Sequence, residues 1–257
     1  MSDIVKLERR GQVLEIRLDR PKANAIDNAT TAELSSAFVS FRDDPDLRVA
    51  IFTGTGRFFS AGWDLKAAAA GEGEDTYVEG GFAGITEMFD LDKPVIAAIN
   101  GHAAGGGFEI ALACDIIIAS DNASMMLSEP RVGLVASGGG MIRLPRRIPR
   151  GIALELLYTG RAMDAAEAYR HGLLSRITTV DNLMTEAREI ADQIVECAPL
   201  SVSTIKSILR ETEALTVEQA YGVQGYNRAY RKMMQSEDFL EGPRAFAEKR
   251  APNWKGR

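Results

Sequence analysis

The residues of this sequence with the types and spacing for chemistry are two glutamates and a run of glycines. Three glycines, 105–107, precede a helical pattern, and Glu109 falls in its first turn. Successive glycines let other atoms approach the main chain closely, and the N–H groups at a helix start have no partner within the helix. Such a junction can hold an anion. Glu129 follows in LSEPRVGL, and two carboxylates beside an anion site indicate acid/base chemistry next to a carbonyl group.

A second turn, RFFSAGWDLK at residues 57–66, offers further main-chain groups. We expect Phe58 and Phe59 in the core, a tight turn at Ala61, and a helix that begins near Asp64. Small residues here would let a ligand approach the backbone. Taken alone, the pattern is more typical of an ordinary turn before a helix.

Alternating strand and helix patterns must position these groups. Residues 3–18 have the alternation of a β-hairpin with a turn at Gly11, and Thr30 with Glu33 has the spacing of a capping box before a helix. Short apolar runs bounded by turn residues predict buried strands at 48–54, 94–101 and 115–120. This alternation predicts an α/β core.

From residue 181 onward the pattern is almost entirely helical. Capping signals at Thr216 with Gln219, and at Ser236, mark further helix starts. We expect a core that holds the active site at 1–195 and a helical oligomerisation region at 196–257. Side chains that form either a contact surface between copies or part of the region's own core are Tyr226, Tyr230, Met233 and Met234.

Composition excludes several classes of function. The formal net charge is −6, which argues against a nucleic-acid-binding or membrane-surface protein, because such surfaces need an excess of lysine and arginine. No apolar run reaches the roughly 18 residues of a membrane span, and the N-terminus lacks a signal-peptide core. With 26% charged and 46% hydrophobic residues, we expect a cytoplasmic globular enzyme.

Neither the cysteines nor the histidines indicate a metal site. Cys114 and Cys197 lie in apolar helical contexts and are expected to be buried thiols. His102 and His171 lack metal-ligand spacing. Two basic clusters are either solvated faces or sockets for ligand phosphates; they comprise Arg143, Arg146, Arg147 and Arg150, and Lys249, Arg250, Lys255 and Arg257.

Five motifs in order make the chain resemble the crotonase, or enoyl-CoA hydratase/isomerase, superfamily over essentially its whole length. They are LDRPKANAID (18–27), FFSAGWDLK (58–66), KPVIAAINGHAAGGGFEIALACD (93–115), SEPRVGL followed by GGGMIRLP (128–145), and SEDFLEGPRAFAEKR (236–250). Within the superfamily the chain is most similar to the carnitinyl-CoA dehydratase subgroup. The resemblance implies an α/β spiral of repeated strand and helix turns with a C-terminal helical region that completes homotrimers, often paired into hexamers.

The resemblance also assigns roles to individual residues. It implies that the N–H groups of Ala61 and Gly106 bind the thioester oxygen, and that Glu109 and Glu129 hold one water molecule between them. Glu109 then helps to activate that water for attack on Cβ, and Glu129 exchanges the proton at Cα. Residues expected to contact substrate or CoA are Lys22, Ala23, Ala25, Gly62, Trp63, Asp64, Leu65, Gly105, Ser137 and Lys249.

The implied activity is reversible hydration of a 2-enoyl-CoA, with crotonobetainyl-CoA to carnitinyl-CoA as the first choice. The alternatives are a general short-chain enoyl-CoA hydratase and a non-catalytic CoA-binding paralogue. CoA is part of the substrate, so no separate cofactor or metal is implied. For a trimethylammonium substrate, Trp63 offers a cation–π partner; alternatively an acidic residue supplies the attraction, the candidates being Glu72, Glu74, Asp75 and Glu79. The segment 136–140, Ala-Ser-Gly-Gly-Gly, departs from the Pro-Gly-Ala-Gly-Gly of many hydratases.

Overall fold

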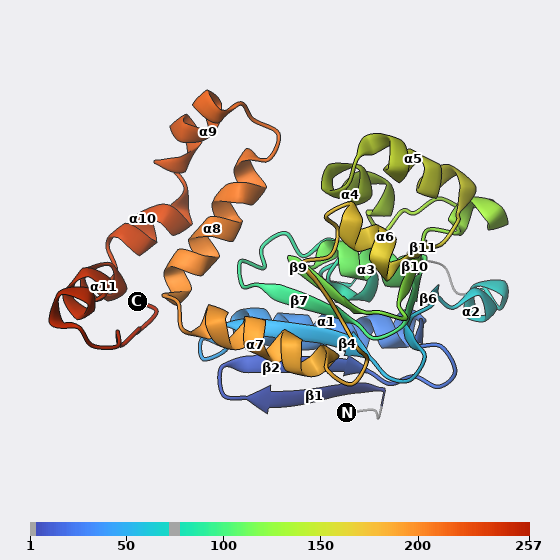
Figure 1. Ribbon diagram of the computed structural model, residues 1–257, viewed down its shortest axis with the longest axis horizontal. Helices are drawn as coiled ribbons and strands as arrows, with labels where there is room; N and C mark the ends of the chain where they lie inside the picture. The colour runs from blue at the N-terminus through green and yellow to red at the C-terminus, as the bar shows by residue number, and fades with distance from the viewer. Residues whose placement is uncertain (1–3, 72–77) are drawn as a thin grey trace.

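A mostly parallel β-sheet forms the centre of the molecule. The computed structural model describes residues 4–71 and 78–257. Within them, a six-stranded sheet has the order β1-β2-β4-β7-β9-β12 (Figure 1). Its strands are β1 (Val5–Arg10), β2 (Val13–Leu18), β4 (Val49–Gly54), β7 (Val95–Ile99), β9 (Ile116–Ser120) and β12 (Arg176–Thr178). The predicted hairpin is confirmed by the antiparallel pair β1 and β2, and the three predicted buried strands are β4, β7 and β9.

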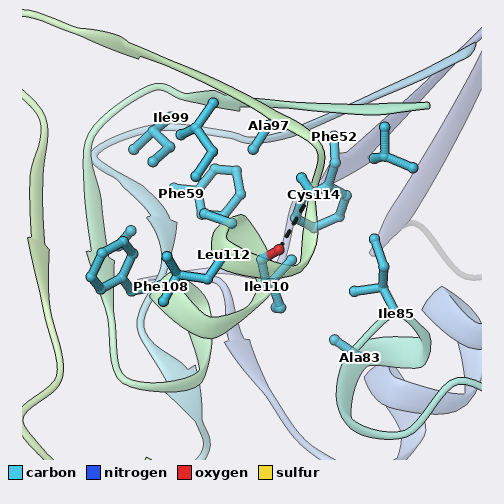
Figure 2. Close-up of a cluster of buried hydrophobic side chains, with 14 of the residues drawn as sticks. Phe52, Phe59, Ala83, Ile85, Ala97, Ile99, Phe108, Ile110, Leu112 and Cys114 are labelled. Atoms are coloured by element: carbon cyan, nitrogen blue, oxygen red, sulfur yellow. Dashed lines mark hydrogen bonds between the residues drawn. The ribbon is translucent and has the colours of Figure 1, made fainter. Parts of the chain in front are cut away.

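Both faces of the inner strands β4, β7 and β9 are buried, which explains the uninterrupted apolar runs in the sequence. In β4, Ala50 and Phe52 face one hydrophobic cluster, whereas Val49 and Ile51 face another. Successive side chains of a strand point to opposite faces, so a strand covered on both sides must be apolar at every position. Figure 2 shows part of the first cluster, where Phe52 and Phe59 meet edge to face with ring centroids 5.3 Å apart.

Helices cover the two faces. On one side lies α7 (Leu183–Val195), which buries Leu183, Ala187 and Ile190 against the sheet. On the other lie α1 (Asn28–Asp43) and α3 (Gly106–Ala113). The helix α1 begins earlier than Thr30, because the side chain of Asp27 caps it by accepting from Thr30 N–H at 2.8 Å. The predicted cap at Thr30 and Glu33 is therefore wrong.

Smaller elements surround the position of the glycine run. A four-stranded sheet, ordered β11-β10-β8-β5, contains β5 (Phe58–Ser60), β8 (His102–Ala104), β10 (Ser124–Met126) and β11 (Met163–Asp164). The short strands β3 (Ala25–Ile26) and β6 (Gly62–Trp63) pair in parallel. Helical segments here are α2 (Leu65–Ala69), η1 (Phe82–Gly84), η2 (Glu129–Val132), α4 (Gly140–Arg147), α5 (Arg150–Thr159) and α6 (Ala165–Arg170).

The last helices extend away from the sheet as an arm, defined here as residues 199–248 (Figure 1). The arm contains α8 (Pro199–Thr212), α9 (Val217–Gln224), α10 (Arg228–Met234) and α11 (Glu237–Glu248). The predicted capping box of Thr216 with Gln219 is confirmed, and so is the Ser236 cap. In the described part of the chain, no helix is both long enough and apolar enough to cross a bilayer.

The two cysteines differ in their surroundings. Cys114 is buried at the end of α3, where its Sγ donates to the Ile110 carbonyl, and burial raises the pKa of its thiol to about 12 (Figure 2). Cys197 follows α7 and is exposed, so the prediction that it is buried is wrong. The chain leaves the sheet at this point, and the apolar neighbours of Cys197 in sequence do not enclose it.

Candidate active site

The glycine run is required by its surroundings at the β8–α3 junction. Gly105 caps α3 with φ of 53°, a left-handed value that favours glycine. A Cβ on Gly106 would lie 2.5 Å from the Phe82 ring, and one on Gly107 would overlap the Ser60 carbonyl group. The start of α3 therefore packs directly against the backbone of β5 and the Phe82 ring of η1, with no side chain of its own between them.

The Gly106 N–H is available to a ligand. It is the first N–H of α3, and no acceptor for it is present among residues 4–71 and 78–257. Gly62 lies beside it, since a Cβ there would be 2.6 Å from the Gly106 nitrogen. The N-terminus of α3 and the strand β6 thus meet backbone to backbone, as an oxyanion site requires.

Ala61 does not supply the partner donor. Its N–H already donates to the Ala23 carbonyl at 3.0 Å, so the prediction that this N–H binds the thioester oxygen is not supported. The register pairs Ile26 with Trp63, and Asp64 N–H donates to the Ile26 carbonyl at 2.9 Å. In a parallel ladder, one residue of each pair bonds to the two neighbours of its partner. Ile26 is that residue here, because it bonds to Asp64, a neighbour of Trp63. The Trp63 N–H therefore points away from β3. Trp63 N–H is therefore the second candidate donor, which could be found only from the pairing of β3 with β6.

Glu109 is held inside the protein by main-chain contacts. It is 4% exposed, and its Oε1 accepts from the Gly140 N–H at 2.8 Å. A Cβ on Gly138 would be 2.7 Å from its Oε2. Gly138, with no side chain, thus allows the backbone to approach the carboxylate closely.

A partly buried cation lies near this carboxylate. Arg143, on α4, donates to the Thr86 carbonyl at 2.6 Å and contacts the Gly138 carbonyl at 3.3 Å. Burial and the neighbouring Arg147 lower the pKa of the Arg143 guanidinium, whereas the charge of Glu109 opposes that shift. Arg143 therefore links the wall behind Glu109 to the segment that carries η1.

Glu129 approaches the same junction from the opposite side. It is the first residue of η2, followed by a proline that suits the first turn of a helix. Its two carboxylate oxygens are shielded from solvent, and Oε1 lies 3.3 Å from where a Cβ on Gly105 would stand. The fold therefore brings two carboxylates separated by twenty residues of chain to one helix start.

Both glutamates line one cavity of about 430 Å³. Eight of the predicted site residues are among its lining, namely Ala61, Trp63, Leu65, Gly105, Gly106, Glu109, Glu129 and Ser137. Lining residues that sequence reasoning missed include Phe82 and Glu87, in GGFAGITEMFD (80–90), a stretch similar to the carnitinyl-CoA dehydratases to which no site role was assigned. The cavity can hold an acyl group with its carbonyl oxygen at the α3 N-terminus.

The remaining predicted contacts lie outside the cavity lining. Asp64 accepts from Arg20 at 2.7 Å and caps α2, and the Arg20 hydrogen bond lowers the pKa of its carboxyl group. Gly62 lies beneath the lining. The other four are Lys22, Ala23 and Ala25 near β3, and Lys249 at the end of α11. CoA contacts by these residues stay a prediction.

Of the four acidic candidates for ammonium recognition, the structure describes one. Glu72, Glu74 and Asp75 lie outside the described residues. Glu79 forms an ion pair with Arg42 and is not part of the cavity lining. Among the described residues, no group of three or more His, Cys, Asp or Glu could hold a metal ion.

Comparison with known proteins places this geometry in context. Residues 8–257 match the family model described as enoyl-CoA hydratase/isomerase. A carnitinyl-CoA dehydratase from Proteus mirabilis is 58% identical over 261 residues, covering all of both chains. The crystal structure of an enoyl-CoA hydratase from Mycobacterium tuberculosis has a TM-score of 0.93 at 39% identity, and that of a carnitinyl-CoA hydratase from Mycobacterium avium a TM-score of 0.78 at 39%; each comparison covers both chains fully.

Proposed function

The chain belongs to the enoyl-CoA hydratase/isomerase family, and on that premise we propose that it catalyses the reversible hydration of crotonobetainyl-CoA to carnitinyl-CoA. The observation that carries the chemistry is the placement of Glu109 and Glu129 in one cavity beside an available Gly106 N–H. The acyl group is inferred from relatives identical at 54–58% of positions over their full length, all named carnitinyl-CoA dehydratase.

In the proposed mechanism the thioester oxygen accepts hydrogen bonds from the N–H groups of Gly106 and Trp63. These donors stabilise the enolate that forms when the hydroxyl group adds to Cβ. Glu109 accepts a proton from the attacking water molecule, and Glu129 delivers a proton to Cα. Dehydration follows the same steps in reverse. Addition therefore starts with Glu129 protonated and Glu109 ionised and ends with the proton on Glu109, and transfer of that proton back to Glu129 through water restores the pair for the next cycle.

Trp63 also has a proposed part in substrate choice. Its ring lies 6.2 Å from that of Phe82, nearly edge to face, and both residues line the cavity. A trimethylammonium group cannot donate an N–H hydrogen bond, and an aromatic face attracts it by roughly 0.5–2 kcal/mol. Trp63→Leu should therefore reduce kcat/KM more for crotonobetainyl-CoA than for crotonyl-CoA. Equal losses on both esters would limit Trp63 to shaping the loop.

We further propose that the arm joins copies into a homotrimer or a pair of trimers. Tyr226 and Met234 are exposed in the single chain, and so are Leu240 and Phe246. Large apolar groups gathered on one extended segment are typical of an interface.

A second candidate function is hydration of an uncharged short-chain enoyl-CoA. The TM-score of 0.93 to the Mycobacterium tuberculosis enoyl-CoA hydratase favours it. Both candidates use the same two carboxylates, whereas a non-catalytic paralogue would have no need of the pair.

The test is hydration by the purified protein of crotonobetainyl-CoA and crotonyl-CoA, measured as kcat/KM for each. A preference for the charged ester supports the first proposal. A preference for crotonyl-CoA supports the second candidate, and no turnover of either ester would contradict both.

A further inference from the structure

The cavity carries more negative charge than hydration requires. Three charged side chains are found among its lining residues in the described chain, Glu87, Glu109 and Glu129, and none of them is a cation. The proposed mechanism uses two of these carboxylates. An uncharged acyl chain would gain no electrostatic attraction from the exposed carboxylate of Glu87, whereas a cationic one would.

Glu87 is positioned by the turn that follows η1. Its N–H donates to the Gly80 carbonyl at 2.8 Å, which closes the loop back on itself. A Cβ on Gly81 would lie within 2.9 Å of three side-chain carbons of Glu87, so the side chain lies directly over Gly81. In the described part of the chain, no hydrogen bond or ion pair engages the Glu87 carboxylate.

The aromatic pair adjoins this carboxylate. Phe82 follows Gly81 in sequence, and its ring packs on Gly106 on one side and near Trp63 on another. An acyl chain that extends from the oxyanion site past Phe82 and Trp63 meets two aromatic rings and the Glu87 carboxylate. Aromatic rings and carboxylates are the two kinds of group that attract a quaternary ammonium.

Given the proposed function, we infer that Glu87 determines specificity by binding the trimethylammonium group of the substrate, with Phe82 and Trp63 as the apolar walls of the same subsite. The carboxylate attracts the cation without a hydrogen bond, and the rings contact its methyl groups. Glu87 takes no part in proton transfer. Its effect is on specificity: it determines which acyl-CoA binds and reaches the transition state.

The chain offers a matched control in the same segment. Glu79 is also a glutamate on the loop before η1, but it pairs with Arg42 and lies outside the cavity lining. Glu79→Gln and Glu87→Gln remove the same charge from positions eight residues apart. A general effect of net charge on CoA-ester binding would appear in both variants.

The experiment compares two substrates of the same shape. Crotonobetainyl-CoA is assayed against 5,5-dimethylhex-2-enoyl-CoA, in which a carbon atom replaces the ammonium nitrogen. In Glu87→Gln, the ratio of kcat/KM for the charged ester to that for the neutral ester should fall about fivefold, and further in Glu87→Lys. Raising the ionic strength should lower the wild-type ratio and change that of Glu87→Gln less.

The outcomes separate this inference from the proposed function. A wild-type preference for the charged ester with an unchanged ratio in Glu87→Gln overturns the role of Glu87 and leaves the proposed function standing. Equal falls in Glu79→Gln and Glu87→Gln also overturn it. A wild type that prefers the neutral ester overturns both proposals.

Discussion

Two neighbouring helices, α7 and α8, have similar lengths and amphipathic patterns but different environments. Helix α7 closes over the central sheet, where Leu183 is 1% exposed. Helix α8 leaves Ile205 and Leu209 59% and 62% exposed. An apolar stripe predicts that a helix has a face to bury, but it does not say what buries that face. Here one stripe is covered by the chain itself, and the other remains on the surface of the single chain.

The candidate active site belongs to the core and not to the arm. Every residue that lines the cavity in the described chain lies between Asn28 and Gly138, and none belongs to the arm. We therefore expect chemistry to depend on the core, and assembly on the arm.

The largest expected effect concerns the two carboxylates, and it tests directly whether chemistry depends on the core and not on the arm. Glu109→Gln or Glu129→Gln should lower kcat at least ~10²-fold, because each removes a positioned acid or base. Glu218→Gln, an exposed change in the arm, is the control and should retain wild-type turnover. If either core variant kept more than about half of wild-type kcat by steady-state assay, the assigned roles would be wrong.

The next effect isolates a single main-chain donor. Gly106→Pro and Gly106→Ala both place a Cβ against the Phe82 ring, but only proline removes the N–H. The proline variant should lose roughly 3 kcal/mol more of transition-state stabilisation than the alanine variant. The measurement is kcat/KM on folded, correctly assembled protein. Equal activities would remove the Gly106 N–H from the site.

Leucine truncation compares the two helices directly. Leu183→Ala in α7 should lower the free energy of unfolding by about 2–5 kcal/mol, because it opens a cavity against the sheet. Leu209→Ala in α8 should change it by less than about 0.5 kcal/mol in the dissociated chain. Urea unfolding at low protein concentration measures both. Similar losses would show that the two stripes are buried alike.

The arm's exposed stripe should instead control assembly. Wild-type protein should sediment as a trimer or hexamer at micromolar concentration, and Leu209→Glu should shift it toward monomer, since a charge would enter an apolar contact. Sedimentation equilibrium decides the matter. A stable wild-type monomer would contradict the assembly proposed for the arm.

The smallest effect concerns local stability within the arm. Thr216→Ala removes the capping box of α9, and such a cap contributes about 1 kcal/mol. Amide hydrogen exchange should become faster in α9 and stay unchanged in α7. Faster exchange throughout the core would mean that the arm and the sheet unfold as one unit.

The sequence predicted best what depends on local pattern. The runs that became β4, β7 and β9 were recognisable because both sheet faces are buried, and Ser236 was recognisable because a cap acts on the next turn. The two glutamates and Gly106 were chosen from their motifs, and the structure places all three at one cavity; their catalytic roles stay a prediction. The fold was predicted from the family resemblance.

What it predicted poorly depends on pairings between distant segments. The sequence did not show that the Ala61 N–H already donates to Ala23, because the direction of each N–H depends on how β6 pairs with β3. Glu87 was missed because only the loop around Gly80 and Gly81 directs it to the cavity. The cap of α1 was misplaced because Asp27 reaches Thr30 before Thr30 can cap a helix of its own.

The two thiols make this protein unusually easy to label at one chosen place. The pKa of Cys114, about 12, keeps that buried thiol protonated at neutral pH, so it should resist maleimides and other alkylating reagents. Cys197 is exposed between α7 and α8. A single fluorophore would therefore attach at Cys197, at the junction between the core and the arm. Its emission could report assembly without any engineered cysteine.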